Sequence, residues 1–264
     1  VAWTQPWHKN WRSFLVAMDK FNEHLSAKGI VFACSMYNIQ HTVTPVNGKL
    51  QVRLECERPD VEIRYTVDGK EPTDRSLLYK NPLMVTDTQT IKCATYRAGR
   101  QMGKILTLPL AWNKATAKPV LGNKQAGKIL VNGIRGSLRQ SDFEWHSWES
   151  SDSVAFTIDL QKKELLRSVS VGCITNYGMA AHKPADIEVW VSNNNRDYRK
   201  VSGKQFTDGE IFREGTFKED VVLDLNKEIG RYVRIIAKGV GECPATHVRP
   251  GQEARIYFDE VMIE

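Results

Sequence analysis

Residues 61–73, VEIRYTVDGKEPT, decide the fold class of the first half of the chain. β-branched and aromatic residues alternate with charged ones at a period of two, which is typical of a half-buried strand. Asp68-Gly69 supplies the positive φ of a tight turn, and Pro72 cannot pair in a strand ladder. The stretch therefore predicts an antiparallel strand that ends in a turn.

Runs with the same alternating pattern lie on either side of this stretch, KLQVRLECE at 49–57 and TIKCATYRAG at 90–99. Short strands with turn residues every 8–12 positions are typical of a small sandwich. We therefore predict an Ig/fibronectin-like β-sandwich over residues 38–117. The following run, NKATAKPVLGNKQAGK at 113–128, has no periodicity and is predicted to be a linker.

A second β-rich unit is predicted over residues 118–264. Its strand-like runs are SVAFTIDL (153–160), LLRSVSVGCI (165–174), ADIEVWVSNN (185–194), DVVLDL (220–225), RYVRIIAKG (231–239) and ARIYFDEVMIE (254–264). Two β-rich units in succession favour sandwiches over a doubly wound sheet. The fold class is therefore mainly β.

The exception is WRSFLVAMDKFNEHLSAKG, residues 11–29. Steps of three and four residues between apolar side chains predict a helix with one apolar stripe, and Gly29 stands where a helix often ends. The stripe consists of Trp11, Phe14, Leu15, Met18, Phe21 and Leu25. Since a lone helix cannot bury its own stripe, we expect it to dock on the first sandwich or to mediate self-association.

The composition is that of a globular protein, with 264 residues, 41% hydrophobic, 26% charged and a net charge of +6. Lys and Arg are scattered among 31 acids, so no nucleic-acid partner is expected. No run approaches the roughly 20 apolar residues of a membrane span. The chain opens without methionine, so we expect its true N-terminus to be missing. Five cysteines without a Cys-x-x-Cys pair argue against a zinc site and a complete disulfide framework.

Several motifs resemble known families. RYTVDGKEPT, LLYKNPLMV and TIKCATYRAG resemble the small sandwich that follows the catalytic barrel in glycoside hydrolase family 20, the β-N-acetylhexosaminidases and chitobiases. EVWVSNNNRDYRKV, RYVRIIAKG and ARIYFDEVMIE resemble a discoidin-like (coagulation factor 5/8 C-type) jelly roll, the fold of family 32 carbohydrate-binding modules. Residues 1–37 are similar to the last helix of the family 20 barrel.

The resemblance implies an activity whose active site is not in this chain. Family 20 enzymes use an Asp-Glu pair at the barrel: the Glu protonates the leaving oxygen, and the Asp orients the substrate's attacking 2-acetamido group. The adjacent acids here, Glu219-Asp220 and Asp259-Glu260, do not end barrel strands. No catalytic residue is assigned, and the chain alone is predicted to be inactive.

A structural calcium ion is the one cofactor that the resemblance implies. In discoidin-like sugar modules calcium sits between an early Asp-Gly loop and a carboxylate near the C-terminus, and it takes six to eight oxygens. Here Asn132 replaces the Asp, Ser137 offers a hydroxyl and Glu260 would close the site, while Arg135 would repel the ion if it points inward. The alternative is that Asn132-Gly133 is a plain turn and Glu260 is solvated or paired with an arginine.

Loop aromatics indicate where a sugar would bind, because pyranose rings stack on aromatic planes while their hydroxyls meet polar side chains. The loops SDFEWHSW, TNYGMAAHKP and PATHVRPGQE are expected to converge at one end of the jelly roll. Their candidates are Trp145, His146, Tyr177, His182, His247 and Arg249. Trp148 precedes a strand and is expected to join the core.

Three functions compete. The favoured one is the non-catalytic C-terminal part of a β-N-acetylhexosaminidase that acts on terminal N-acetylhexosamine, with a weak glycan-binding module. Its partners would be glycans and its own missing catalytic barrel, and its location periplasmic or extracellular. The alternatives are a purely structural appendage of the barrel and a free-standing adhesion protein. The unmatched helix argues against the last, and the loop aromatics favour the first.

Overall fold

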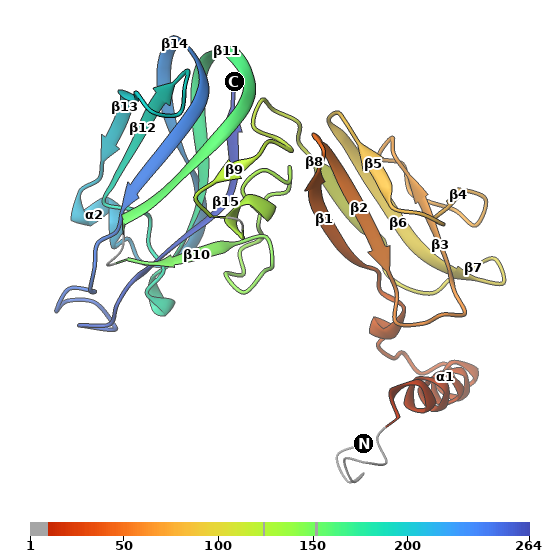
Figure 1. Ribbon diagram of the computed structural model, residues 1–264. Coiled ribbons are helices and arrows are strands. Elements are labelled where there is room, and N and C mark those ends of the chain that lie inside the picture. The colour runs from red at the N-terminus through yellow and green to blue at the C-terminus, as the bar shows by residue number, and fades with distance from the viewer. Residues whose placement is uncertain (1–9, 124, 151–152) are drawn as a thin grey trace. The chain divides into compact units, whose positions relative to one another are not determined.

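A computed structural model describes residues 10–123, 125–150 and 153–264 (Figure 1). Residues 1–9 of the expected barrel-derived segment 1–37 lie outside the described residues. The chain divides into two compact units, which are described separately. The first holds residues up to 42 with 53–82 and 89–108, and the second holds 43–52, 83–88 and 109–264.

Two small antiparallel sheets and one helix make up residues 11–110. The elements are α1 (Trp11–Ala27), η2 (Ser35–Tyr37), β1 (Gln40–Val46), β2 (Lys49–Glu55), β3 (Glu62–Thr66), β4 (Leu77–Leu78), β5 (Leu83–Val85), β6 (Gln89–Arg97), β7 (Arg100–Gln101) and β8 (Leu106–Leu110). The strand orders are β1-β2-β5 and β4-β3-β6-β7, with β8 beside β6. The prediction at 61–73 is confirmed: β3 pairs antiparallel with β6, and Gly69 turns the chain at φ +76°.

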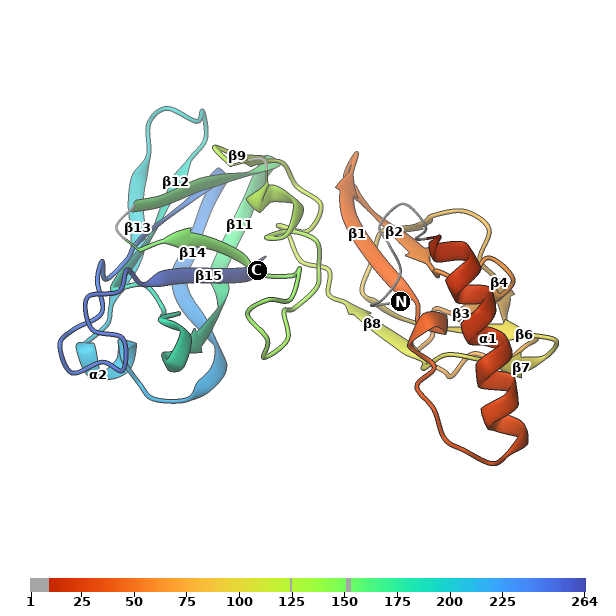
Figure 2. The same cartoon turned by 90° about the horizontal axis from the view of Figure 1, so that it is seen from below.

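Helix α1 begins and ends as its sequence predicts. The Asn10 side chain caps it by accepting a hydrogen bond from Ser13 N at 3.0 Å. Gly29 follows its last turn at φ +70°. The helix lies beside the end of β6 (Figure 2). There the Asp19 carboxylate accepts from Arg58 Nη2 at 3.0 Å, from Arg97 Nη1 at 2.6 Å and from the Tyr37 hydroxyl.

The prediction that the apolar stripe docks the helix holds for part of the stripe: Phe14, Met18 and Leu25 are half-buried. Leu15 is buried, but Trp11 and Phe21 are 57% and 54% exposed. The buried neighbours of Leu15 on this face are polar: Asn22 is 4% exposed and Asp19 is held by two arginines. Ion pairs therefore dock α1 on its unit, and part of the stripe faces outward.

Besides residues 43–52 and 83–88 of the small β1-β2-β5 sheet, the second unit contains one extended antiparallel sheet that folds over on itself. Its elements are β9 (Val120–Leu121), η3 (Ala126–Lys128), β10 (His146–Glu149), β11 (Ser153–Asn176), η4 (Tyr177–Met179), β12 (Asp186–Ser192), β13 (Arg199–Gln205), α2 (Asp208–Ile211), β14 (Thr216–Lys238) and β15 (Arg255–Ile263). The strand order is β10-β15-β11-β14-β12-β13, with β9 beside β11.

Two long strands, β11 and β14, contribute to both layers of this sandwich (Figure 1). Their pairing slips between Asp159 and Glu164 and again between Leu166 and Ser168. Before the slips β14 also pairs with β12, and after them β11 also pairs with β15. Bulges are how a strand turns a sandwich corner and passes from one layer to the other. The mainly β fold is confirmed, and the second unit contains a β-sandwich whose two layers share long strands.

The linker prediction at 113–128 is wrong. Ala115 and Ala126 are fully buried in the core of the second unit, and Val120–Leu121 pairs with β11. Small side chains gave this segment no visible periodicity, yet they let its backbone approach the core closely. Trp148 packs on Phe156 and Phe258, which confirms its expected place beside the core.

All five cysteines are free thiols in described segments of the chain. Burial raises the pKa of Cys93 to about 12, so this thiol stays neutral as a small apolar core residue. Among the residues that the structure describes, each helix is too short or too polar to cross a membrane.

Candidate functional site

Three loops of the second unit meet at one end of its sandwich. The loop after β11 joins the loop before β14 through Tyr177 N, which donates to Gly215 O at 3.0 Å. The loop before β15 joins it through Arg249 Nε, which donates to Gly178 O at 2.6 Å. The expected convergence holds for the loops of Tyr177 and His247. The third participant is the segment that carries α2, which the sequence did not indicate.

Four rings from these loops form what we call the aromatic cluster: Tyr177, His182, Phe212 and His247. The ring centroids of Tyr177 and His247 are 4.0 Å apart, and those of His182 and His247 are 5.1 Å apart. Phe212 lies edge-on to His182 at 5.0 Å. Phe212 had no sequence signal, because its segment carries no sugar-binding pattern and its place follows only from the path of α2.

Both histidines of the cluster are buried, His182 at 1% and His247 at 4% exposure. Nδ1 of His182 lies 3.2 Å from Ile211 O, and Nδ1 of His247 accepts from Arg249 N at 3.0 Å. Burial, and then the neighbouring His247, lower the pKa of His182 to about 4. Burial likewise lowers the pKa of His247. Both rings are therefore neutral near pH 7.

The rim of the aromatic cluster is accessible. Arg249 and Met179 are exposed and Tyr177 is half-buried. Arg249 Nη1 donates to Gln252 Oε1 at 3.1 Å, which fixes its guanidinium beside Gly178. The rim therefore combines a phenol ring, a thioether and a positioned cation, which is the mixture of apolar face and polar donors that a sugar ring can use.

Trp145 and His146 do not join this cluster in the way we expected. Trp145 is only 6% exposed, and its Nε1 donates to Ser137 O at 2.9 Å. Its ring fills the space beside Gly136, so the prediction of a sugar-stacking plate at Trp145 is wrong. His146 is half-buried on β10, where its ring lies 4.4 Å from that of Trp148 and burial lowers its pKa.

The residues expected to bind calcium come together only in part. Gly133 N donates to Oε2 of Glu260 at 3.0 Å, which brings this carboxylate to the 132–133 turn. Oε1 of Glu260 is buried without a hydrogen-bond partner among the described residues, and burial raises the pKa of Glu260. A buried acceptor of this kind fits a cation. Ser137 Oγ instead accepts from Arg139 N at 3.2 Å.

Arg135 points toward the acids, as the alternative interpretation allowed, but it pairs with Asp259 rather than Glu260. Its Nε donates to Asp259 Oδ2 at 3.0 Å, and its Nη2 binds Asp220. The other expected acid, Glu219, accepts from Lys183 Nζ at 3.0 Å. Three of the four adjacent acids are thus engaged in ion pairs.

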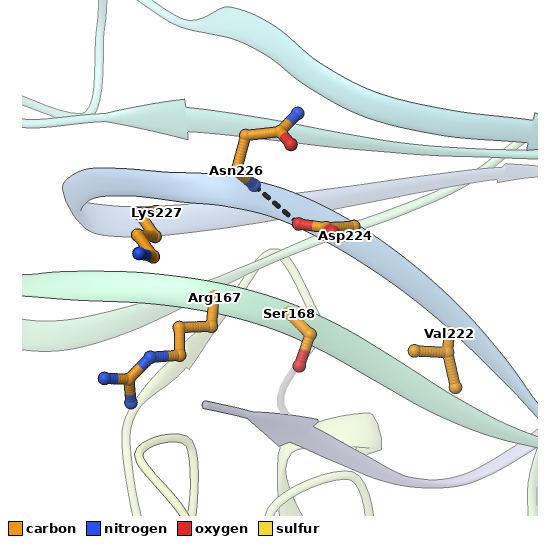
Figure 3. Close-up of a pocket in the computed structure, with 6 residues that line it drawn as sticks. All are labelled: Arg167, Ser168, Val222, Asp224, Asn226 and Lys227. Carbon is orange, nitrogen blue, oxygen red and sulfur yellow. Dashed lines mark hydrogen bonds between the residues drawn. The ribbon is translucent and has the colours of Figure 1, made fainter.

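A shallow groove of about 530 Å³ lies on the β11–β14 pair, away from the aromatic cluster (Figure 3). It is lined by Arg167, Ser168, Val222, Asp224, Asn226 and Lys227. Asp224 Oδ1 accepts from Asn226 N at 2.7 Å, which shapes the turn after it. The groove gathers no aromatic ring, so the loop end remains the better candidate site.

Comparison with known families supports both family resemblances seen in the sequence. Residues 44–107 match the model of the chitobiase/beta-hexosaminidase C-terminal domain. Residues 115–248 match the model of the F5/8 type C domain. A search of the curated proteins finds no match.

Solved structures that resemble this chain do so at low identity. Chitosan-binding module 1 of a chitosanase/glucanase from Paenibacillus sp. IK-5 is 14% identical, covers 58% of this chain and 98% of its own, and has a TM-score of 0.37. A CBM32-4 module of Clostridium perfringens in complex with GlcNAc-α-1,4-galactose is 18% identical, with coverage of 58% and 94% and a TM-score of 0.36. The C-terminal domain of a chitobiase from Bacteroides fragilis is 12% identical, with coverage of 50% and 76% and a TM-score of 0.30.

Proposed function

Because the chain belongs to the F5/8 type C domain family through residues 115–248, we propose that its second unit binds glycans. The observation that carries the proposal is the rim of the aromatic cluster, where Tyr177 and Met179 stand beside the fixed guanidinium of Arg249. Sandwich strands bury their inward faces, so the loop end is where an aromatic ring and free donors can meet a ligand. Fold alone does not give function, so the proposal rests on this rim.

The match of residues 44–107 supports a glycoside hydrolase context. We propose that the chain is the non-catalytic C-terminal part of a β-N-acetylhexosaminidase that acts on terminal N-acetylhexosamine, in the periplasm or outside the cell. Its own catalytic barrel would be its protein partner. The chain alone should give no turnover of a chromogenic N-acetylglucosaminide above the buffer blank, and turnover that a point substitution abolishes would contradict this.

A structural calcium ion is part of the same proposal. Glu260 Oε1 and the 132–133 turn would hold it, and Asn132 Oδ1, which accepts from Ile134 N at 2.9 Å, retains a second lone pair. Ser137 would contribute only after its loop moves. When bound, the ion would neutralise the buried carboxylate and fix the turn.

Sugar titration followed by NMR or calorimetry tests glycan binding. N-acetylhexosamines and galactose should bind with a Kd of about 0.1–1 mM, since one stacked ring and two or three exposed hydrogen bonds supply roughly that much. Arg249→Ala and Tyr177→Ala should each remove saturable binding. Arg196→Ala, in an exposed loop outside the cluster, is the matched control and should leave it unchanged.

The purely structural appendage is the second candidate, and the burial of Trp145, His182 and His247 favours it. These side chains would then be core residues that stiffen the loops. The same titration distinguishes the two candidate functions. The absence of binding at tens of millimolar sugar would support the appendage and overturn the glycan site.

A further inference from the structure

We propose that His182, Cys243 and His247 form a zinc site inside the loop end of the second unit. One ligand atom from each residue lies within 4.8 Å of the other two, and all three side chains are buried. The proposal goes beyond glycan binding and does not depend on it, because zinc can be measured with no sugar present.

Each imidazole has one buried ring nitrogen without a hydrogen-bond partner in the described part of the chain, and in His247 this nitrogen becomes a ligand after a change of tautomer. Nε2 of His182 and Nε2 of His247 are both buried and lack hydrogen-bond partners among the described residues. Such orphaned buried nitrogens are costly unless something binds them. In His182 the other nitrogen, Nδ1, lies 3.2 Å from Ile211 O and can donate to it. A metal-binding histidine typically donates its second N–H to a carbonyl in this way, which fixes the tautomer and aims the lone pair.

The third ligand, Cys243, is held rigidly near His247. Three residues separate them, a spacing common within zinc-binding motifs. Cys243 N donates to Gln252 O at 2.8 Å, Gly251 N donates to Cys243 O at 3.0 Å, and His247 N donates to Pro244 O at 2.9 Å. These backbone hydrogen bonds therefore hold the Cys243 thiol and the His247 ring on one side of the short loop before any ion binds.

The donor set selects the metal class. One thiol and two imidazoles, without a carboxylate, suit zinc and do not suit calcium or magnesium, which prefer oxygen ligands. Zn–S and Zn–N bonds of about 2.3 and 2.0–2.1 Å place tetrahedral ligand atoms roughly 3.3–3.8 Å apart. The three atoms lie up to 4.8 Å apart, so the widest pair must close in by roughly 1–1.5 Å. The fourth coordination position is left for water or a small ligand.

Binding changes two protons. The Cys243 thiol becomes a thiolate and its proton passes to solvent, since the thiolate is the form that binds metal. Arg249 N–H now donates to Nδ1 of His247, so the neutral ring carries its proton on Nε2. Coordination by Nε2 moves that proton to Nδ1 and breaks the Arg249 amide hydrogen bond. The Arg249 guanidinium opposes the ion's charge, but it is held outward by Gly178 O and Gln252 Oε1.

This site departs from the expectation that the cysteines exclude zinc. That expectation considered only pairs of cysteines in sequence. Here one cysteine combines with a histidine of its own loop and with His182, which precedes it by three strands in sequence but lies close to it in space.

Cobalt substitution tests the proposal on the whole chain. The protein is stripped with EDTA, dialysed and titrated with Co²⁺ and then Zn²⁺, with absorption spectra and metal content measured. We expect one Co²⁺ per chain with a thiolate-to-cobalt charge-transfer band, and displacement of that band by one Zn²⁺. The backbone amide resonance of Arg249 should shift at the same point of the titration. Cys243→Ser should remove the band, and His182→Asn should weaken metal affinity at least about tenfold.

Matched controls are Cys34→Ser and His24→Asn, a half-buried thiol and an exposed imidazole outside the site, which should keep full metal content. If the wild-type chain shows no thiolate band or binds well below one equivalent, the proposal is overturned, whatever the variants do. A band that survives Cys243→Ser in a folded protein overturns it equally. A null sugar titration with an intact band would contradict the glycan proposal alone.

Discussion

Nε of Arg135 donates to Oδ2 of Asp259 across 3.0 Å and so joins the loop before β10 to the last strand of the chain. Asp259 is fully buried, and Gly136 N gives the same oxygen a second hydrogen bond at 2.9 Å. Burial raises the pKa of Asp259, although the Arg135 charge and these hydrogen bonds oppose the rise. Arg135 is therefore the cation that stabilises the ionised form of the Asp259 carboxylate.

Arg135→Ala should destabilise the protein by about 3–5 kcal/mol, because removing one partner of a buried pair leaves an uncompensated charge. Chemical denaturation of the second unit's transition measures the loss. Arg199→Ala is the control: its pair with Glu228 is exposed and should be worth less than about 1 kcal/mol. Equal losses in the two variants would show that Asp259 has another means of compensation.

Asp19→Asn should loosen α1. Burial raises the pKa of Asp19, but hydrogen bonds from Arg97 and Tyr37 and the charges of Arg97 and Arg58 outweigh it and leave the pKa below its usual value. A lowered folded-state pKa contributes stability that is present above the unfolded value of about 3.9 and is lost as pH falls through the folded value.

Hydrogen exchange over residues 11–27, corrected for intrinsic rates, checks this prediction. Protection in the wild type should fall between pH 5 and pH 3, and Asp19→Asn should already be less protected at pH 7. Asp87→Asn, at an exposed position, should behave like the wild type. A helix whose protection is the same in all three proteins would mean that Leu15 and its apolar contacts suffice.

Gly136→Ala should cost about 1–3 kcal/mol, because the added Cβ would lie 2.3 Å from Cε2 of Trp145 and would force this buried ring to move. Thermal unfolding measures the change. Gly209→Ala meets nothing within 4 Å and should be close to neutral. A harmless Gly136→Ala would indicate that Trp145 swings outward, which would restore it as a sugar-stacking ring.

Calcium at ten times its Kd should stabilise the protein by about 1.4 kcal/mol if it binds the native state alone. A rise in Tm on adding calcium after EDTA treatment, larger than with magnesium, measures this effect. Glu260→Gln should abolish the rise, and Glu264→Gln, an exposed acid in the same strand region, should keep it. An unchanged Tm in the wild type would leave Glu260 as a buried, protonated acid.

Local patterning predicted the parts of the fold that depend on neighbours in sequence. Alternation located β3 and β6, and Gly29 and Gly69 marked a helix end and a turn. The docking face of α1 could not be predicted in this way. Its stripe implied an apolar partner, and Leu15 is buried, but the ion pairs of Asp19 with Arg58 and Arg97 had no sequence signal because they depend on the tertiary fold.

The candidate site shows the same limit. Tyr177, His182, His247 and Arg249 could be predicted because aromatic and polar side chains on sandwich loops are the groups that can contact a sugar. Trp145 was misplaced because a tryptophan just before a strand can face either way, and its burial depends on the open space at Gly136. Phe212 and Cys243 had no sequence signal of a site, since only the path of α2 and the last loop brings them to His182 and His247.

The long β11–β14 pair also governs how fast the second unit can form. It places Ser153 opposite Lys238 and Asn176 opposite Thr216, so every rung of this central ladder closes a long loop. Closing such long loops costs chain entropy before the strand contacts contribute any stability. This order of events is expected to slow folding to the range of milliseconds to seconds. Until β14 arrives, β11 presents two unpaired edges. We therefore expect that the longest strand of the second unit is open to pairing with other chains until β14 has formed.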